Sequence, residues 1–134
     1  MTIVINNLQS AFQAALNFYP ELCDRKISVD TLKMTITKRR VVFGRVHTLT
    51  DVRGEQKWMI FFNSRVLAQN PPVEVLIEVF AHELEHIARG DIGPNSSTSR
   101  PHAGKRIDRS VDAKLPTEVV CRARQWREDF LNSL

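Results

Sequence analysis

Cysteine is scarce in this sequence of 134 residues, and long apolar runs are absent from it. The two cysteines, Cys23 and Cys121, share no C-x-x-C spacing, which disfavours a disulfide framework or a cysteine-based metal site. We expect both to be buried thiols in a reducing compartment. No apolar run approaches the length of a membrane span, and no charged segment followed by an apolar one opens the sequence. We therefore expect a cytoplasmic protein with no membrane partner.

The remaining composition is that of an ordinary globular protein. Hydrophobic residues make up 43% and charged residues 25%, enough to bury a core without disulfides. The length predicts one domain over residues 1–134. The formal net charge of +4 is compatible with a phosphate-rich partner but does not require one.

Apolar spacing predicts an N-terminal helix followed by a small sheet. The helix runs from about Asn7 to Tyr19 and is ended by Pro20. Three runs of strand character follow, at residues 31–37, 41–49 and 56–62. Gly44 interrupts the second run, where we expect a bulge. Short polar connections between the runs predict a three-stranded antiparallel meander.

The second half of the sequence predicts helices. Asn70-Pro71-Pro72 supplies a cap and a first turn for a long apolar helix that reaches Arg89 and is stopped by Gly90. A loop rich in Gly, Pro, Ser and Thr extends to Gly104. Two further helices are expected, at residues 102–113 and 116–131. The fold class is therefore α+β.

The segment His82-Glu83-Leu84-Glu85-His86 has the H-E-x-x-H spacing. Residues four apart in an α-helix lie on one face, so His82 and His86 can both ligate one tetrahedral zinc ion. Glu83 would then lie beside a zinc-bound water and act as its general base. The same spacing also occurs by chance on surface helices, where its residues are only solvated.

The helical wheel makes Glu83 the most informative residue of this segment. Glu83 falls inside the broad apolar arc, close in angle to Leu76 and Val79, where an unpartnered carboxylate is costly to bury. A purely structural helix would carry Leu or Ala there. The opposite polar strip holds Glu74, Glu78, Glu85 and Arg89.

Zinc needs a third protein ligand besides the two histidines and a water. His47 precedes the helix on an expected strand, and we interpret it as structural. His102 follows a loop long enough to fold back, and we predict that it is the third ligand. The acidic alternatives are Asp108 and Asp112 and, after them, Asp91 and Glu118.

The order of these segments resembles the SprT-like metallopeptidases. In that family a strand ending in hydrophobic-Asn-x-x-hydrophobic leads to the H-E-x-x-H helix. Here Phe62-Asn63-Ser64-Arg65-Val66 precedes Ala81-His82-Glu83-Leu84, and fifteen residues separate His86 from His102. The resemblance covers about residues 41–112. The family's third histidine usually stands in Gly-His-Gly-x-x-Phe, whereas this sequence has Pro101-His102-Ala103-Gly104.

The resemblance implies a zincin-like fold and zinc-dependent hydrolysis of peptide bonds, on proteins associated with DNA and with DNA as activator. An extended substrate would pair with a strand beside the cleft, either residues 58–62 or a neighbouring strand. Two alternatives stay open. One is a zincin-fold binding module that does not cut, and the other is a gluzincin-like peptidase, of the type that cleaves regulators, with an acidic third ligand.

Basic residues fit a DNA partner only loosely. They form the turn Lys38-Arg39-Arg40, flank His102 (Arg100, Lys105, Arg106, Arg109) and stud the expected last helix (Arg122, Arg124, Arg127). We interpret most of them as solvated helix and loop faces. Trp126 is expected to be a core anchor, not a platform for a base.

Overall fold

The computed structural model describes the backbone of residues 2–90 and 101–134, and the side chains of residues 7–90 and 107–134. Within these residues the elements follow in the order α1 (Thr2–Leu16), the 3-10 helix η1 (Pro20–Leu22), β1 (Ile27–Leu32), β2 (Gly44–Thr50), β3 (Gln56–Asn63), α2 (Ser64–Leu67), α3 (Val73–Arg89), α4 (Pro101–Lys114) and α5 (Thr117–Asn132). The predicted α+β class is confirmed.

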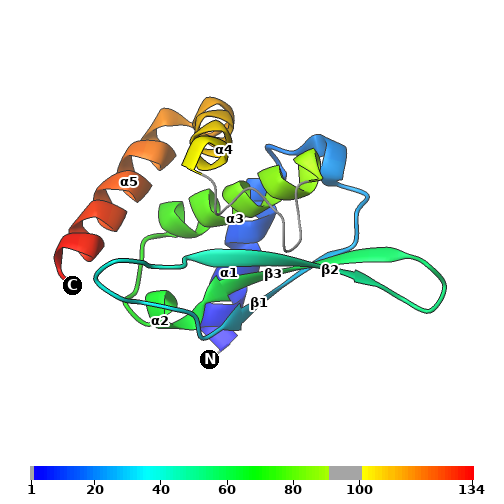
Figure 1. Ribbon diagram of the computed structural model, residues 1–134, viewed down its shortest axis with the longest axis horizontal. Coiled ribbons are helices and arrows are strands. Elements are labelled where there is room, and N and C mark those ends of the chain that lie inside the picture. Colours follow the sequence, from blue (N-terminus) through cyan, green and yellow to red (C-terminus); the bar gives the residue numbers. More distant parts are fainter. Residues whose placement is uncertain (1, 91–100) are drawn as a thin grey trace.

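Helix α3 is the centre of the molecule. It packs beside α1 and contacts β2 and β3, while α4 and α5 pack against it (Figure 1). Phe80 of α3 joins the layers, because its ring centroid lies 5.8 Å from that of Phe12 in α1 and 6.0 Å from that of Phe62 in β3. Helix α3 is therefore held in position by contacts with helices and strands on several sides.

The sheet is mixed, so the predicted antiparallel meander is wrong. The strand order is β1-β3-β2, with β1 parallel and β2 antiparallel to β3. The most apolar strand takes the centre, because Trp58, Ile60 and Phe62 of β3 are all buried. The register from Gly44↔Phe62 to Thr50↔Gln56 is regular, so Gly44 is not a bulge.

The first strand lies earlier than the predicted run at residues 31–37. After Leu32 the chain leaves the sheet, and Ile36 and Val41 form only an isolated antiparallel bridge. Asn63 anchors the segment between β1 and β2. Its buried side chain accepts hydrogen bonds from the N–H groups of Met34 (3.2 Å) and Arg65 (3.0 Å), and its Nδ2 donates to the Val42 carbonyl (2.7 Å). The Asn thus caps α2 and anchors the segment before β2.

Some of the predicted helix ends agree with the structure and others do not. Gly90 has φ 70° and closes α3, as predicted. Asn70 does not cap α3, because the helix begins only after Pro72. Helix α1 begins earlier than predicted and ends at Leu16, and the predicted helices at 102–113 and 116–131 are found as α4 and α5.

Cys23 and Cys121 are both free thiols, but both are exposed, so their predicted burial is wrong. None of the helices in the described ranges combines the length and the apolar character that crossing a bilayer requires. Trp126 is half-buried and stacks on Phe130, with ring centroids 5.2 Å apart, in agreement with a packing role.

Glu85 is the centre of a buried polar cluster that joins three parts of the chain. Its carboxylate accepts hydrogen bonds from the Tyr19 hydroxyl (2.9 Å), Arg89 Nε (2.8 Å) and Lys114 Nζ (3.1 Å). Burial opposes ionisation of Glu85, but these three donors outweigh it and hold its pKa below the ordinary value. The segment after α1 and the end of α4 are thereby tied to α3.

The lowered pKa of Glu85 predicts a loss of stability in acid. A carboxylate that is stabilised in the folded state contributes fully above its unfolded pKa, near 4.5, and this contribution is lost as the pH falls through the lower folded pKa. Wild type should therefore exceed Glu85→Gln by about 2 kcal/mol in the free energy of unfolding at pH 7, and by less at pH 3. Urea unfolding at both pH values measures this difference.

Glu78→Gln is the matched control for this prediction. Burial raises the pKa of Glu78 despite its pairing with Arg127, so protonation stabilises the folded state relative to the unfolded one. The free energy of unfolding of wild type, relative to that of Glu78→Gln, should therefore increase as the pH falls from 7 to 3. A Glu85→Gln difference that stays constant from pH 7 to pH 3 would contradict the assignment.

Candidate metal centre

The H-E-x-x-H segment lies in the last two turns of α3, which ends at Arg89. The rings of His82 and His86 lie one turn apart on the same face, with centroids 5.3 Å apart and planes at 70°. His86 is buried, and His82 is half-buried. The two imidazoles therefore share one face of α3, as their four-residue spacing predicts.

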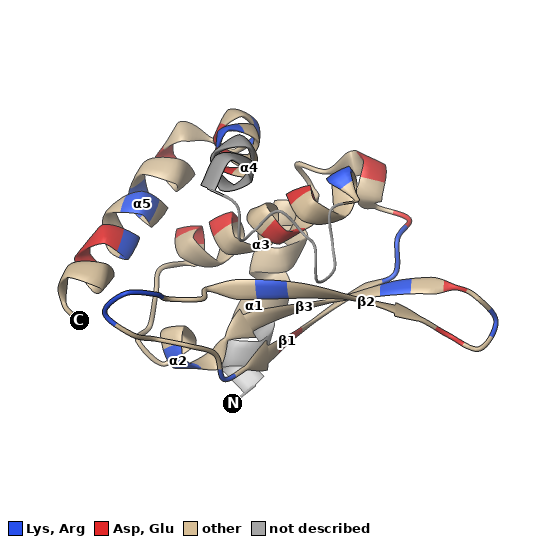
Figure 2. Ribbon diagram, in the orientation of Figure 1, with Lys and Arg blue, Asp and Glu red and all other residues tan. Residues whose placement is uncertain are grey.

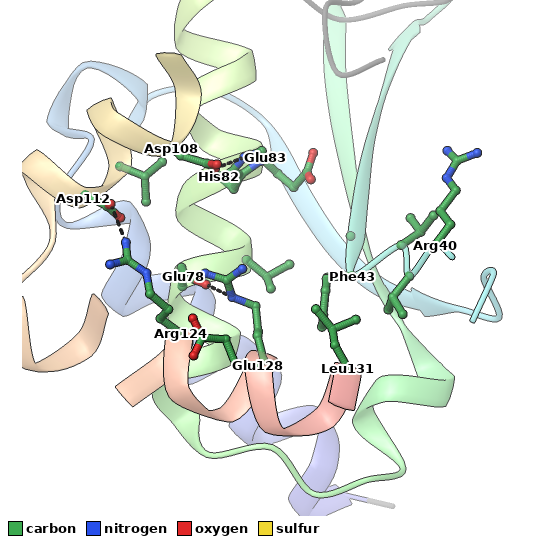
Figure 3. Close-up of a pocket in the computed structure, with 16 residues that line it drawn as sticks. Arg40, Phe43, Glu78, His82, Glu83, Asp108, Asp112, Arg124, Glu128 and Leu131 are labelled. Carbon is green, nitrogen blue, oxygen red and sulfur yellow. Dashed lines mark hydrogen bonds and ion pairs between the residues drawn. The ribbon is translucent and has the colours of Figure 1, made fainter. Parts of the chain in front are cut away.

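Glu83 is only 7% exposed, as its place in the apolar arc predicts. Its carboxylate lies in the wall of a cleft with a volume of about 510 Å³. The cleft runs between α3, the segment that leads into β2, and the two C-terminal helices (Figure 3). Besides His82 and Glu83, its wall includes Phe43, Val79, Asp108 and Leu131. A buried carboxylate therefore faces a space large enough for part of a ligand.

Asp108 of α4 contacts the first histidine. One of its carboxylate oxygens lies 3.0 Å from Nε2 of His82 (Figure 3). Burial opposes the charged form of His82, but the hydrogen bond to Asp108 and the nearby carboxylate of Glu83 outweigh it and raise the pKa of His82. The same hydrogen bond lowers the pKa of Asp108. Asp108 thus stabilises the protonated form of His82.

Asp108→Asn is expected to lower the pKa of His82, because the variant loses the carboxylate that stabilises the imidazolium ion. Titration of the His82 ring proton by NMR, assigned with His82→Ala, measures this change. Asp112→Asn is the matched control, since Asp112 pairs with Arg124 at 2.9 Å. An unchanged His82 pKa in Asp108→Asn would contradict the contact.

The third metal ligand is not assigned by the described side chains. His102 is the second residue of α4, but its side chain lies outside the described ones, as does Asp91. Among the side chains that are described, no three His, Cys, Asp or Glu groups form a metal site. Asp112 is paired with Arg124, and Glu118 is exposed in the first turn of α5. Of the acidic alternatives that can be placed, only Asp108 contacts a predicted ligand.

The polar strip predicted for α3 is partly buried, at Glu78 and Glu85. Glu78 is 7% exposed, and both its oxygens pair with the Arg127 guanidinium, at 2.6 and 3.1 Å. Glu74 is half-buried and lies 3.6 Å from Arg122. Helix α5 packs on this strip and supplies the arginines (Figure 2). Arg122 and Arg127 pair with acids of α3, whereas Arg124 pairs with Asp112 of α4, so no single spacing in the sequence indicates these pairs.

The basic residues 38–40 and His47 lie on β2 or in the segment before it. Lys38, Arg39 and Arg40 are exposed in the connection that precedes β2 (Figure 2), and Arg40 borders the cleft. His47 is exposed on β2, with its ring edge-on to Phe61 at 5.5 Å, in agreement with a structural role.

The sequence was also compared with known proteins. No protein-family model and no curated protein matches it.

Proposed function

We propose that this protein is a zinc-dependent endopeptidase of the SprT-like kind. The observation that carries the proposal is the position of Glu83, a 7% exposed carboxylate in a cleft wall directly beside His82. Peptide hydrolysis needs a general base, and a carboxylate in the cleft wall next to the first histidine of the motif is placed for that role. The packing of α3 against a sheet whose strand β2 leads from the cleft supports a zincin-like fold.

The residues present fit a zinc ion. His82 and His86 would hold it, because imidazole nitrogens on one helix face match the ligands and the geometry that zinc prefers. The third donor would be His102, as the family resemblance implies, or Asp108, as its contact with His82 favours. When bound, zinc supplies Lewis-acid polarisation of a carbonyl and lowers the pKa of water.

Glu83 performs the proton transfers of the proposed reaction. Its carboxylate takes the proton of the attacking water and later delivers it to the leaving amine. Glu83 is only 7% exposed, so its access to bulk water is limited. A proton held at Glu83 is thus kept beside the reacting groups.

An extended peptide would bind along the outer edge of β2. The strand at residues 58–62 is excluded as the docking edge, because β3 is paired on both sides. Within the described residues, β2 ends the sheet and begins at the cleft. Its outer main-chain groups are therefore the ones that an added strand would meet.

We propose DNA as an activator because basic residues cluster in one segment of the chain. Residues 31–50 contain five basic residues and no acidic one, and all five are exposed: Lys33, Lys38, Arg39, Arg40 and Arg45. This surface reaches the cleft at Arg40. The arginines of α5 do not contribute, because Arg122, Arg124 and Arg127 pair with acidic side chains.

A second candidate is a gluzincin-like peptidase with Asp108 as the acidic third ligand, which its 3.0 Å contact with His82 favours. It differs from the first in the ligand set and not in the role of Glu83. Loss of zinc binding in Asp108→Ala with retention in His102→Ala would select it. The reverse result would select the SprT-like ligand set.

Cleavage of fluorescein-labelled casein tests the proposed function. We expect cleavage by the zinc-loaded protein, its loss on chelation, its return on addition of zinc, and acceleration by DNA at low salt. Casein that remains intact after long incubation with zinc-loaded protein, with and without DNA, would contradict the proposal and favour a non-catalytic binding module.

A further inference from the structure

Gly44 is the point where β2 comes closest to α3. A β-carbon built on Gly44 would lie 2.7 Å from Cγ1 of Val79 and 3.2 Å from the Phe61 carbonyl oxygen. The same β-carbon would lie 3.5 Å from Oε1 of Glu83. Because Gly44, Val79 and Glu83 all line the cleft, an added side chain would project into it.

The backbone of Gly44 lies where the outer edge of β2 begins. The Asn63 N–H donates to the Phe43 carbonyl (2.9 Å), so the antiparallel alternation turns the N–H and C=O of Gly44 away from β3. On that outer side, the preceding Val42 N–H is already bonded to the Thr35 carbonyl (3.1 Å). Gly44 is the next residue to face outward, and it lies beside the Glu83 carboxylate.

Glycine here does not serve an unusual backbone conformation. The positive-φ residues in the described part of the chain are Gly54, Asn70 and Gly90, and Gly44 is not one of them. Glycine within a regular strand instead marks a place where another backbone approaches closely. The side chain of Val79 lies on one side of Gly44, and the carboxylate of Glu83 lies on another.

We propose that Gly44 is a substrate-positioning residue, whose missing side chain keeps open the part of the cleft through which a peptide main chain reaches Glu83. The proposal rests on the proposed peptidase function and names a specific residue for it. The absence of a side chain at Gly44 then has two effects: it allows close packing against Val79, and it leaves access to Glu83. A substitution at Gly44 alone impairs both, so a second substitution is needed.

Three variants separate these uses: Gly44→Ala, Val79→Ala and the double variant. Val79→Ala removes the atom that the new methyl group would contact at 2.7 Å. The Gly44→Ala change should therefore lower the unfolding temperature less in the Val79→Ala background than in wild type, because only the 3.2 Å approach to the Phe61 carbonyl oxygen remains in the double variant. In the double variant the methyl group still stands beside Glu83. Its kcat/KM on labelled casein should stay about a hundredfold below that of Val79→Ala.

Binding provides a readout that needs no turnover. In the zinc-loaded Glu83→Gln background, adding Gly44→Ala and Val79→Ala together should weaken binding of fluorescein-labelled casein relative to adding Val79→Ala alone. Fluorescence anisotropy measures both dissociation constants. If rate and binding in the double variant match those of Val79→Ala, Gly44 serves packing only and the inference is overturned. Absence of cleavage in wild type would reject the proposed function instead, and the binding comparison would still test Gly44.

Discussion

Glu83→Gln is expected to lower kcat for peptide cleavage by about a thousandfold, the loss that follows removal of a general base. Glutamine has nearly the same size as glutamate but cannot take up the proton of the attacking water. Because glutamine nearly matches glutamate in size, the buried site should stay filled and the melting temperature should stay close to that of wild type. Zinc affinity should also be retained. Initial rates on labelled casein, thermal unfolding and zinc titration measure the three expectations.

Glu55→Gln is the matched control for this variant. It makes the same chemical change in an exposed carboxylate between β2 and β3, where Glu55 pairs with Lys26 at 2.6 Å. Its cleavage rate should equal that of wild type. If Glu83→Gln instead keeps wild-type kcat, Glu83 is not the base and the proposed mechanism is wrong.

His82→Ala and His86→Ala are each expected to weaken zinc binding by more than about a hundredfold. Loss of a partner outside the ligand shell already costs up to about that factor, and loss of a ligand costs more. Competition with a fluorescent zinc indicator measures the affinities. Cleavage should fall with zinc occupancy in both variants.

His47→Ala is the control for the histidine variants, because His47 is exposed on β2 and packs edge-on to Phe61. It should bind zinc with wild-type affinity. His86 is buried, so unfolding of the metal-free His86→Ala protein shows whether its fold persists. Wild-type zinc affinity in either His82→Ala or His86→Ala would remove that residue from the site.

Helix α3 and the burial of Glu83 could be predicted because both follow from local periodicity. The apolar arc fixes which face of α3 meets the core, and Gly90 ends the helix through a positive φ that glycine adopts freely. The position of Glu83 in that arc follows from the same periodicity. These features need no knowledge of what packs against the helix.

The features that could not be predicted depend on partners distant in sequence. Glu78 and Glu85 are buried because Arg127, Lys114 and Tyr19 reach them across 49, 29 and 66 residues. No periodicity in α3 indicates those partners. The same holds for the strand order, since nothing within β1 or β2 specifies that both pair with β3.

Gly44 shows a related limit of sequence reasoning. A glycine inside a strand-like run suggests a bulge, whereas the structure shows regular pairing and a close approach of α3. The distinction depends on Val79, which lies 35 positions later in the sequence. Only the packed structure shows which use of the glycine applies.

A crystal structure of the protein grown with zinc, with anomalous data collected at the zinc edge, would locate the metal. We expect one strong anomalous peak bound by the imidazoles of both His82 and His86, at about 2.0–2.1 Å from each ligating nitrogen, at the cleft that Glu83 lines. The same map would identify His102 or Asp108 as the third ligand. Absence of a peak at these two histidines, with zinc present in excess, would show that they do not form a zinc site.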